Sequence, residues 1–260
     1  MYIALTVAGS DSGGGAGIQA DLKTFHQLGV YGTSVVTAIT AQNTVGVSRW
    51  EAVAAEMVRA QLDAVATDLR PRAFKTGMLA DAGIVSAVAA GAREHELHGY
   101  VLDPVMVATS GDALIEHDAV AAIREQLIPL CAVVTPNAHE AALLTGLTVE
   151  SESDLARAAE ALVRELGAGA ALVKGGHVDT GDETVDVLYD GSAVAFRNRR
   201  IETTSTHGTG CTLSAAITAE LAKGMDLRGA CARAVEFVHR AIEAAPGLGS
   251  GHGPLNHFVR

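Results

Sequence analysis

The sequence predicts an α/β fold with a mostly parallel central sheet and one added antiparallel hairpin. Short β-like runs alternate with amphipathic helical segments along the chain, as in consecutive βαβ units. Twenty-eight glycines against 4% aromatic residues indicate many tight turns between strands and alanine-rich helices, which fits α/β layers better than a β-sandwich. The alternation has no repeat period and no linker rich in Pro, Ser or charge, so residues 1–260 are expected to form one domain.

Each predicted strand is a short apolar run that stops at glycine, proline or a polar side chain. Runs of this kind are typical of strands that a parallel sheet buries on both faces. The last two runs flank Asp190-Gly191, a turn signal for an antiparallel hairpin. With their terminal turns, the expected strands are 2–8, 32–40, 73–78, 100–105, 131–137, 170–173, 185–189 and 193–196.

Each predicted helix carries apolar residues three and four positions apart, which places them on one buried face. A proline follows the second helix and ends it. The apolar stripe of that helix is Val58, Leu62, Val65 and Leu69. In chain order the expected helices are 18–28, 51–69, 81–95, 151–166 and 213–223.

Composition indicates which kinds of binding partner and which cellular compartment to expect. The formal net charge of −11 argues against nucleic acid or an anionic membrane as a general partner, because both attract clustered Lys and Arg. Three cysteines, an odd number without zinc-finger spacing, predict neither a disulfide framework nor a structural metal. The chain shows no basic leader before its first apolar run and no apolar run of membrane-spanning length. We therefore expect a soluble, cytoplasmic protein.

The stretch 206–212 has the pattern of an anion site at the start of a helix. Gly208 and Gly210 flank Thr209, which lets the backbone turn and direct N–H groups outward, and the following helix adds the positive end of its dipole. Cys211 is expected where that helix begins, a position that favours the thiolate over the thiol. A glycine-rich turn followed by a buried cysteine would give the same pattern, so this stretch alone leaves both interpretations open.

A second glycine-rich loop, 9–17, follows the first predicted strand. It contains neither G-x-G-x-x-G nor G-x-x-x-x-G-K-[ST], so neither common nucleotide fingerprint applies. Its glycines would let a small ligand lie against the backbone, and a flexible turn is the other interpretation. After the next strand, Gln42 and Asn43 supply amide groups that both donate and accept hydrogen bonds, which suits a heteroaromatic ring.

Polar side chains also follow three later strands. Asp103 ends an apolar run, and ligands bind at the carboxyl edge of parallel strands. Asn137 and Glu140 lie three apart at a helix start, where they would either bind hydrated Mg²⁺ or form a capping box. Lys174 precedes two glycines and would either reach a nucleotide phosphate or remain a solvated loop lysine.

Four other residues are expected to have structural roles and no part in catalysis or ligand binding. Lys75 is predicted to be a surface lysine at the end of its strand, without a catalytic role. His207 is predicted to order its loop rather than to bind a ligand. Cys131 and Cys231, one on a strand and one in the final helix, are predicted to lie in the core.

Seven motifs occur in a fixed order along the chain: 8–21 (AGSDSGGGAGIQAD), 40–44 (TAQNT), 75–78 (KTGM), 103–106 (DPVM), 135–140 (TPNAHE), 173–177 (VKGGH) and 207–212 (HGTGCT). Jointly they resemble the hydroxymethylpyrimidine/phosphomethylpyrimidine kinases of thiamin biosynthesis, a family of the ribokinase-like superfamily. The match covers essentially the whole length. It is specific as a set, although Asn-x-x-Glu and Gly-x-Gly are weak alone. Ser205 departs from the family pattern, which has Asn there.

The resemblance implies a ribokinase-like three-layer α/β/α sandwich, a homodimer and two successive ATP-dependent phosphorylations. These would convert 4-amino-5-hydroxymethyl-2-methylpyrimidine to its monophosphate and then to the diphosphate. By the same resemblance, the pyrimidine pocket would be lined by Gly9, Ala16, Asp21, Gln42, Met78 and Val105. The Mg-ATP side would be formed by Asn137, Glu140, Lys174 and Thr209, with Asp103 and Glu140 near the metal.

In this resemblance Cys211 stands where many ribokinase-like sugar kinases carry an aspartate as catalytic base. A thiolate there would accept the proton of the substrate hydroxyl. Gly208, Thr209 and Gly210 would direct N–H groups at the transferred phosphoryl group.

Two other functions fit much of the same pattern. A pyridoxine or pyridoxal kinase would phosphorylate a similar hydroxymethyl-bearing ring. A non-catalytic pyrimidine-binding protein would need the pocket but not the reactive groups, and the presence of Cys211 together with Lys174 and Glu140 argues against it.

Overall fold

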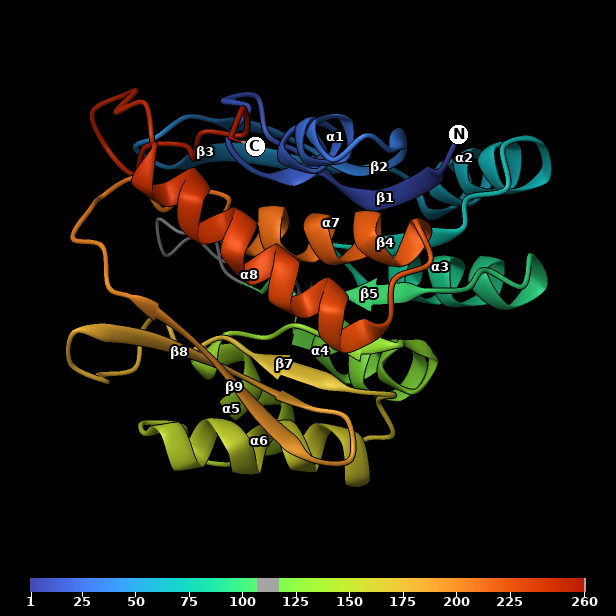
Figure 1. Cartoon of the computed structure of the whole chain (residues 1–260). Coiled ribbons are helices and arrows are strands. Elements are labelled where there is room, and N and C mark those ends of the chain that lie inside the picture. The colour runs from blue at the N-terminus through green and yellow to red at the C-terminus, as the bar shows by residue number, and fades with distance from the viewer. Residues whose placement is uncertain (107–116, 260) are drawn as a thin grey trace.

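The computed structural model describes residues 1–106 and 117–259, and in these residues one sheet of nine strands has helices against both faces (Figure 1). The strand order is β3-β2-β1-β4-β5-β6-β7-β8-β9. Neighbours from β2 to β7 pair in parallel, whereas β3 at one edge and β8 and β9 at the other are antiparallel. The α/β prediction and its antiparallel hairpin are therefore confirmed. The strands are β1 Ile3–Ser10, β2 Tyr31–Gln42, β3 Val47–Ala52, β4 Ala73–Thr76, β5 Tyr100–Leu102, β6 Val133–Val134, β7 Ala171–Val173, β8 Glu183–Tyr189 and β9 Ala193–Arg199.

The helices form the two outer layers of a three-layer sandwich (Figure 1). Adjacent residues of β5 show the division: Val101 packs with α7 and α8, whereas Leu102 packs in the core under α2 to α6. A π turn at 123–127 and a 3-10 turn at 128–130 continue α4. The helices are α1 Gly17–Gln27, α2 Ala55–Asp68, α3 Ala82–Glu94, α4 His117–Ala122, α5 Ala138–Thr145, α6 Glu152–Arg164, α7 Thr209–Ala222 and α8 Leu227–Glu243.

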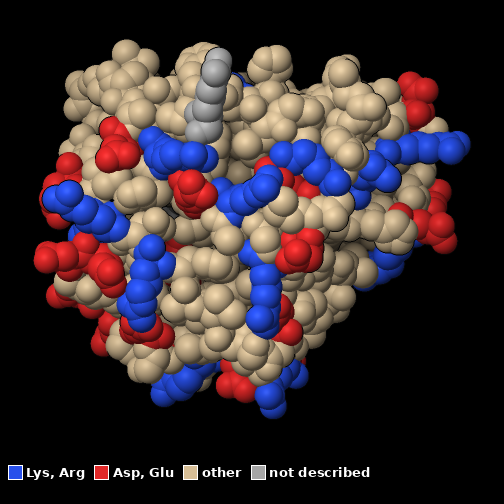
Figure 2. Space-filling view, in the orientation of Figure 1, with Lys and Arg blue, Asp and Glu red and all other residues tan. Residues whose placement is uncertain are grey.

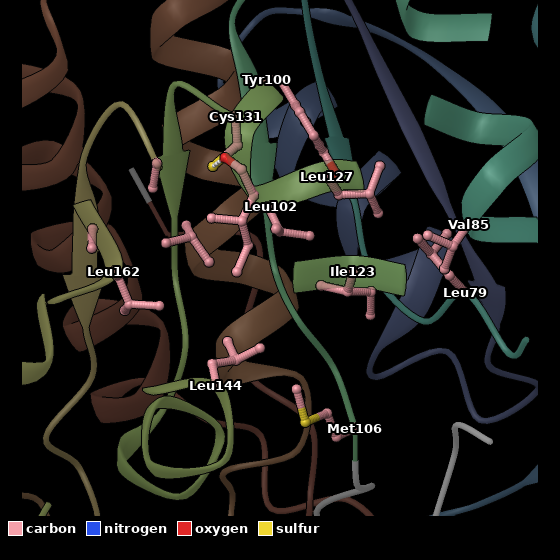
Figure 3. Packing of buried hydrophobic residues seen from close by; sticks show 14 of the residues in the cluster. Leu79, Val85, Tyr100, Leu102, Met106, Ile123, Leu127, Cys131, Leu144 and Leu162 are labelled. Carbon is pink, nitrogen blue, oxygen red and sulfur yellow. Dashed lines mark hydrogen bonds between the residues drawn. The ribbon is translucent and has the colours of Figure 1, made fainter. Parts of the chain in front are cut away.

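The larger core lies between the sheet and the layer of α2 to α6, and it is mostly aliphatic (Figure 3). Leu102 from β5, Leu127 from the π turn and Leu144 from α5 are each 0% exposed. Burying one such side chain contributes about 1.5–3 kcal/mol. The rings of Phe74 and Tyr100 stack beside them with centroids 4.4 Å apart. This packing holds the short central strands, and hence their carboxyl ends, in place.

The strand order reverses at β1, which makes this strand a topological switch point of the sheet. After β1 the chain adds β2 on one side, and later β4 on the other. In open parallel sheets, ligands bind in the crevice that such a reversal leaves at the carboxyl ends of the strands. The loop 9–17 leaves β1 at this edge, and Gly77 and Met78 leave β4 there.

The strand β3 is absent from the sequence prediction, which placed 51–69 in a helix. Residues 47–52 instead form an edge strand antiparallel to β2, and α2 begins only at Ala55. The prediction that Leu69 lies on the buried stripe is also wrong, because the helix ends at Asp68 and Leu69 is 36% exposed. Hydrophobic period alone does not separate a short edge strand from the first turn of a helix.

The helix α7 begins at Thr209, four residues before the predicted start at Leu213. Gly208 is its N-cap, with φ of 84°. The predicted boundary was late because glycine and threonine have low helix propensity, and packing against α1, α8 and the sheet outweighs it. Cys211 therefore lies within the first helical turn.

Charged side chains of both signs are interspersed on the face that Figure 2 shows, and Lys and Arg form no continuous basic surface there. Several are paired across elements, such as Arg228 with Asp190 at 2.6 Å. None of the helices in the described parts of the chain is long and apolar enough to cross a membrane.

Candidate active site

A cavity of about 690 Å³ opens at the carboxyl edge of the parallel strands. Its wall includes both glycine-rich loops, the ends of β4 and β5, and the start of α7. The structure thus brings together residues that are up to about two hundred positions apart in the sequence. The predicted site residues that line it are Gly9, Ala16, Gln42, Met78, Asp103, Val105, Asn137, Glu140, Lys174, Gly208, Thr209, Gly210 and Cys211.

Asp21 is the exception, and the prediction that it lines the pocket is wrong. Its side chain is 0% exposed and lies behind the wall, where Oδ1 accepts a hydrogen bond from Lys75 at 2.9 Å and Oδ2 accepts one from Thr6 at 2.6 Å. The prediction that Lys75 is a surface lysine is wrong as well, because it is also 0% exposed. Strand β4 lies in the middle of the sheet, so a side chain near its end is covered by the helix packed on it.

Asp11 organises the first glycine-rich loop, and sequence reasoning did not single it out. Its carboxylate accepts hydrogen bonds from the backbone N–H groups of Gly13, Gly15 and Ala16 at 2.7, 3.0 and 2.8 Å. Burial alone would raise the pKa of Asp11, but these donors and His207 hold it below its usual range. An Asp two residues before a glycine run is a known turn-forming pattern, and this was the available signal.

His207 joins this loop to the start of α7, which confirms its predicted role in ordering the loop. Its Nε2 lies 2.8 Å from Asp11 Oδ2, and both side chains are buried. The two loops also touch directly. A Cβ on Gly208 would overlap the carbonyl oxygen of Gly15, well inside the 3.0 Å that Cβ atoms essentially never cross. The two glycine-rich loops therefore interlock.

The start of α7 has the geometry of an anion site. No side chain caps the helix, and helix geometry leaves the N–H groups of Gly210 and Cys211 without an acceptor inside the helix. Thr209 Oγ1 donates to the carbonyl of Thr206 at 2.6 Å, which fixes the turn before the helix. Lys174 Nζ lies only 3.1 Å from the position that a Cβ on Gly210 would take. A lysine charge thus stands beside the free backbone donors.

Cys211 does not have the lowered pKa that its place at a helix start predicted. Burial raises the pKa of Cys211 to about 12, although the ammonium of Lys75 counteracts this. At neutral pH the residue is therefore predominantly a thiol. Cys131 and Cys231 are buried in the core, as predicted.

Two carboxylates and one ammonium meet in the cavity wall beside the start of α7. Lys174 Nζ lies 3.2 Å from Asp103 Oδ1 and 4.0 Å from Glu140 Oε2. Ser214 from α7 donates to Asp103 Oδ2 at 3.2 Å. Burial, with a smaller contribution from Asp103, raises the pKa of Glu140 to about 7, although Lys174 opposes the shift. The cluster carries more negative than positive charge when both acids are ionised.

Asn137 and Glu140 form the capping box that the sequence left as one of two interpretations. The Asn137 side chain accepts from the Glu140 N–H at 2.9 Å, and Glu140 Oε2 accepts from the Asn137 N–H at 2.8 Å. Both residues also line the cavity. The capping box therefore fixes the Glu140 carboxylate in the wall of the cavity.

The remaining wall has a slot with apolar sides and one amide. Met78 covers Gly9, and its Sδ lies 3.1 Å from the position a Cβ on Gly9 would take. Gln42 Oε1 accepts from Thr40 Oγ1 at 3.2 Å, and its Nε2 lies 3.5 Å from His207. Because His207 Nε2 donates its proton to the Asp11 carboxylate, it does not accept one from Gln42. Thr40, which also donates to the Ser10 carbonyl at 2.9 Å, therefore holds the amide in the cavity wall.

Comparisons with known proteins found a family model, similar sequences and similar structures. The model of the family described as phosphomethylpyrimidine kinase matches residues 11–256. A hydroxymethylpyrimidine/phosphomethylpyrimidine kinase from Rhizobium meliloti is 57% identical over 99% of this chain and 97% of its own. The structure of an ADP complex of Bacillus subtilis pyridoxal kinase is similar with a TM-score of 0.91 and 40% identity, covering 99% of this chain and 97% of that one. A phosphomethylpyrimidine kinase structure from Clostridium difficile 630 has a TM-score of 0.82 at 39% identity, covering 93% and 100%.

Proposed function

Because this chain belongs to the phosphomethylpyrimidine kinase family and is a phosphotransferase, we propose that it phosphorylates 4-amino-5-hydroxymethyl-2-methylpyrimidine with ATP in thiamin biosynthesis. A second transfer to the monophosphate gives the diphosphate. One observation carries the proposal: a single cavity is lined by the apolar side chains of Met78 and Val105, by a helix start with free N–H groups, and by a Lys-carboxylate cluster beside that helix start. These are the parts that phosphoryl transfer to a heteroaromatic alcohol requires.

The slot at Met78, Gly9 and Val105 takes the pyrimidine ring, and the missing side chain of Gly9 lets Met78 pack against the backbone as one wall of that slot. The Gln42 amide faces the aminopyrimidine edge, where it both donates and accepts. The ring then directs its hydroxymethyl group toward the start of α7.

The cluster of Asp103, Glu140 and Lys174 takes the Mg-ATP phosphates. With both acids ionised, two carboxylates face one ammonium, and this excess of negative charge fits a divalent cation. In the described part of the chain no three His, Cys, Asp or Glu side chains stand close enough to hold a metal on their own, so a bound Mg²⁺ would also need phosphate oxygens and water as ligands. Bound Mg²⁺ would neutralise charge on the phosphates. Lys174 adds a point charge beside Gly210.

The substrate hydroxyl oxygen attacks the γ-phosphorus of ATP, and the bond from that phosphorus to the β-phosphate bridging oxygen breaks. The free N–H groups of Gly210 and Cys211 donate to the transferred phosphoryl group. Cys211 Sγ accepts the hydroxyl proton in the enzyme fraction that carries a thiolate. Because burial raises the thiol pKa to about 12, this fraction grows about tenfold per pH unit in the neutral range.

Cys211→Ala and Cys211→Asp test the proton-acceptor role. Cys211→Ala is expected to bind ATP but to lose about 10²–10⁴-fold in kcat. Cys211→Asp restores a base and should recover part of the rate, with a flatter rise of kcat with pH because a carboxylate is already ionised at neutral pH. Near-parental turnover in Cys211→Ala would remove Cys211 from the chemistry and leave the helix start as an anion site.

Product analysis by mass tests the function itself. Pure protein incubated with Mg-ATP and the hydroxymethylpyrimidine should yield the monophosphate and then the diphosphate. The second candidate, pyridoxal kinase, is favoured by the similarity to the Bacillus subtilis pyridoxal kinase structure. Phosphorylation of pyridoxal without diphosphate formation from the pyrimidine monophosphate would select it. Turnover of neither alcohol would refute both.

We also propose that two copies associate, as the family resemblance implies. Three large apolar side chains are exposed on neighbouring elements: Ile39 on β2, Val45 in the following turn and Met57 on α2. Apolar side chains of this size are candidates for burial by a partner copy. Sedimentation analysis should show a dimer, and Ile39→Glu should shift it toward the monomer. A monomeric parent protein would refute the proposal.

A further inference from the structure

Behind the wall of the cavity lies a buried ion pair that the proposed mechanism does not use. Lys75 Nζ donates to Asp21 Oδ1 at 2.9 Å, and both side chains are 0% exposed. Thr6 Oγ1 donates to Asp21 Oδ2 at 2.6 Å, so both oxygens of the carboxylate have a partner. The ammonium has three N–H donors and only one hydrogen-bond acceptor among the described residues, Asp21.

The pair lies directly behind the start of α7. Thr6 is on β1, Asp21 on α1 and Lys75 on β4, and α7 packs against all three of these elements. Lys75 Nζ is 3.7 Å from the position a Cβ on Gly77 would take, and Gly77 lines the cavity. Gly77, which has no side chain, therefore lies in the wall between the ammonium and the cavity.

A buried ion pair of this kind contributes little net folding free energy. Replacing a buried ion pair by apolar residues of similar volume is often neutral or stabilising, because desolvation of two charges offsets their attraction. The neighbours on the same face of the sheet include apolar residues, with Ala4 on β1, Ala73 on β4 and Ala215 on α7 each at most 1% exposed. An apolar pair would suit them, so the charges require another explanation.

Four charged groups act on the Cys211 sulfur. Lys75 and Asp21 lie behind the wall, and Lys174 and Asp103 lie on the nucleotide side. Lys174 is shared between Asp103 and Glu140, whereas among the described residues Lys75 has an ion pair only with Asp21. The Gly17 N–H also faces the sulfur. Lys75 is thus the cation whose charge is most available to the thiol.

We infer that Lys75 is a positioning residue whose buried ammonium stabilises negative charge on Cys211 Sγ, and that Asp21 holds the ammonium in place and moderates its effect. The inference rests on the proposed function in assigning a use to that charge. In the proposed step the hydroxyl O–H bond breaks, the oxygen bonds to the γ-phosphorus, ADP leaves with the bridging oxygen and the proton goes to the thiolate. Lys75 keeps its own protons throughout and acts on the sulfur only by its charge.

Alkylation of Cys211 by iodoacetamide tests the inference without requiring turnover. The Sγ thiolate forms a bond to carbon, iodide leaves with its electron pair and the thiol proton has gone to solvent. The rate at Cys211, measured by mass on its peptide as a function of pH, reports the thiolate population. Lys75→Met should slow it about tenfold or more at fixed pH, a shift of at least about one pH unit. Asp21→Asn should accelerate it, because the ammonium then acts without its counter-charge.

Opposite signs distinguish an electrostatic role from a structural one, since loss of packing would change both variants in the same direction. Thr6→Val removes a hydrogen bond of the network but no charge, and should leave the alkylation profile unchanged. If Lys75→Met fails to fold, comparing the Lys75→Met/Asp21→Asn double variant with Asp21→Asn isolates the ammonium in a core without an unpaired anion. Equal alkylation profiles in that comparison, or shifts of one sign in the two single variants, would overturn the inference.

A second readout separates this inference from the proposed function. If Cys211 accepts the substrate proton, Lys75→Met should lower kcat and shift its pH profile in step with alkylation, with little change in the KM for the pyrimidine. If alkylation shifts but the kcat profile does not, Lys75 controls the thiol and the base role of Cys211 fails. If kcat falls while alkylation is unchanged, the role assigned to Lys75 is wrong.

Discussion

Replacing Gly208 by alanine should separate catalysis from stability, because this glycine is where the two glycine-rich loops interlock. Its φ of 84° lies in the left-handed region, which costs an alanine about 1–2 kcal/mol. The added Cβ would also overlap the Gly15 carbonyl oxygen. Since both atoms belong to the backbone of anchored loops, the loops must part by more than about 1 Å, and misplacement on this scale costs about 10²-fold in rate.

Gly224→Ala is the matched control. Gly224 follows α7 with φ of 90°, and nothing lies within 4 Å of the Cβ it would gain. The free energy of unfolding, measured in urea, should therefore fall by about 1–2 kcal/mol in both variants because of left-handed strain at the new alanine. It should fall further only in Gly208→Ala. Only Gly208→Ala should lose about 10²-fold in kcat/KM. If the two variants keep the same kcat/KM, the interlock does not position the anion site.

Three further predictions concern the polar wall of the cavity. Gln42→Leu should raise the KM for the pyrimidine about tenfold, since an unmade buried hydrogen bond costs about 1–3 kcal/mol, and leave the KM for ATP unchanged; equal effects on both would contradict the assignment. Lys174→Ala should raise the KM for ATP with little change in Mg²⁺ dependence, whereas Glu140→Gln should shift the Mg²⁺ titration; identical titrations would contradict the division of roles. Because the pKa of Glu140 is raised to about 7 in the folded protein, the folded state binds a proton that the unfolded state has released above its usual 4.5, so stability should fall as pH rises from about 5 to about 8. Thermal unfolding without ligands should show this fall, by at most about 3 kcal/mol, and Glu140→Gln should flatten it.

Local sequence was sufficient for most of the fold. The apolar residues of strands and helices recur with short periods that can be read from the sequence. Each predicted strand stops at a glycine, a proline or a polar residue, which mark turns. These signals place Asp103, Lys174 and the loop 206–212 at one edge of a parallel sheet, because carboxyl ends of parallel strands meet there. All of the site residues that the family motifs predicted, except Asp21, line the cavity.

The failures share one cause, which is that burial and charge environment depend on elements distant in sequence. Lys75 and Asp21 are 54 positions apart, and Asp11 and His207 are 196 apart. Nothing near Lys75 in the chain shows that α7 will cover it, so a strand-end lysine was expected in solvent. The prediction for the pKa of Cys211 failed for the same reason. The sequence indicates that Cys211 lies near a helix start, but the desolvation that outweighs the helix dipole arises only when α1, β1 and β4 pack around it.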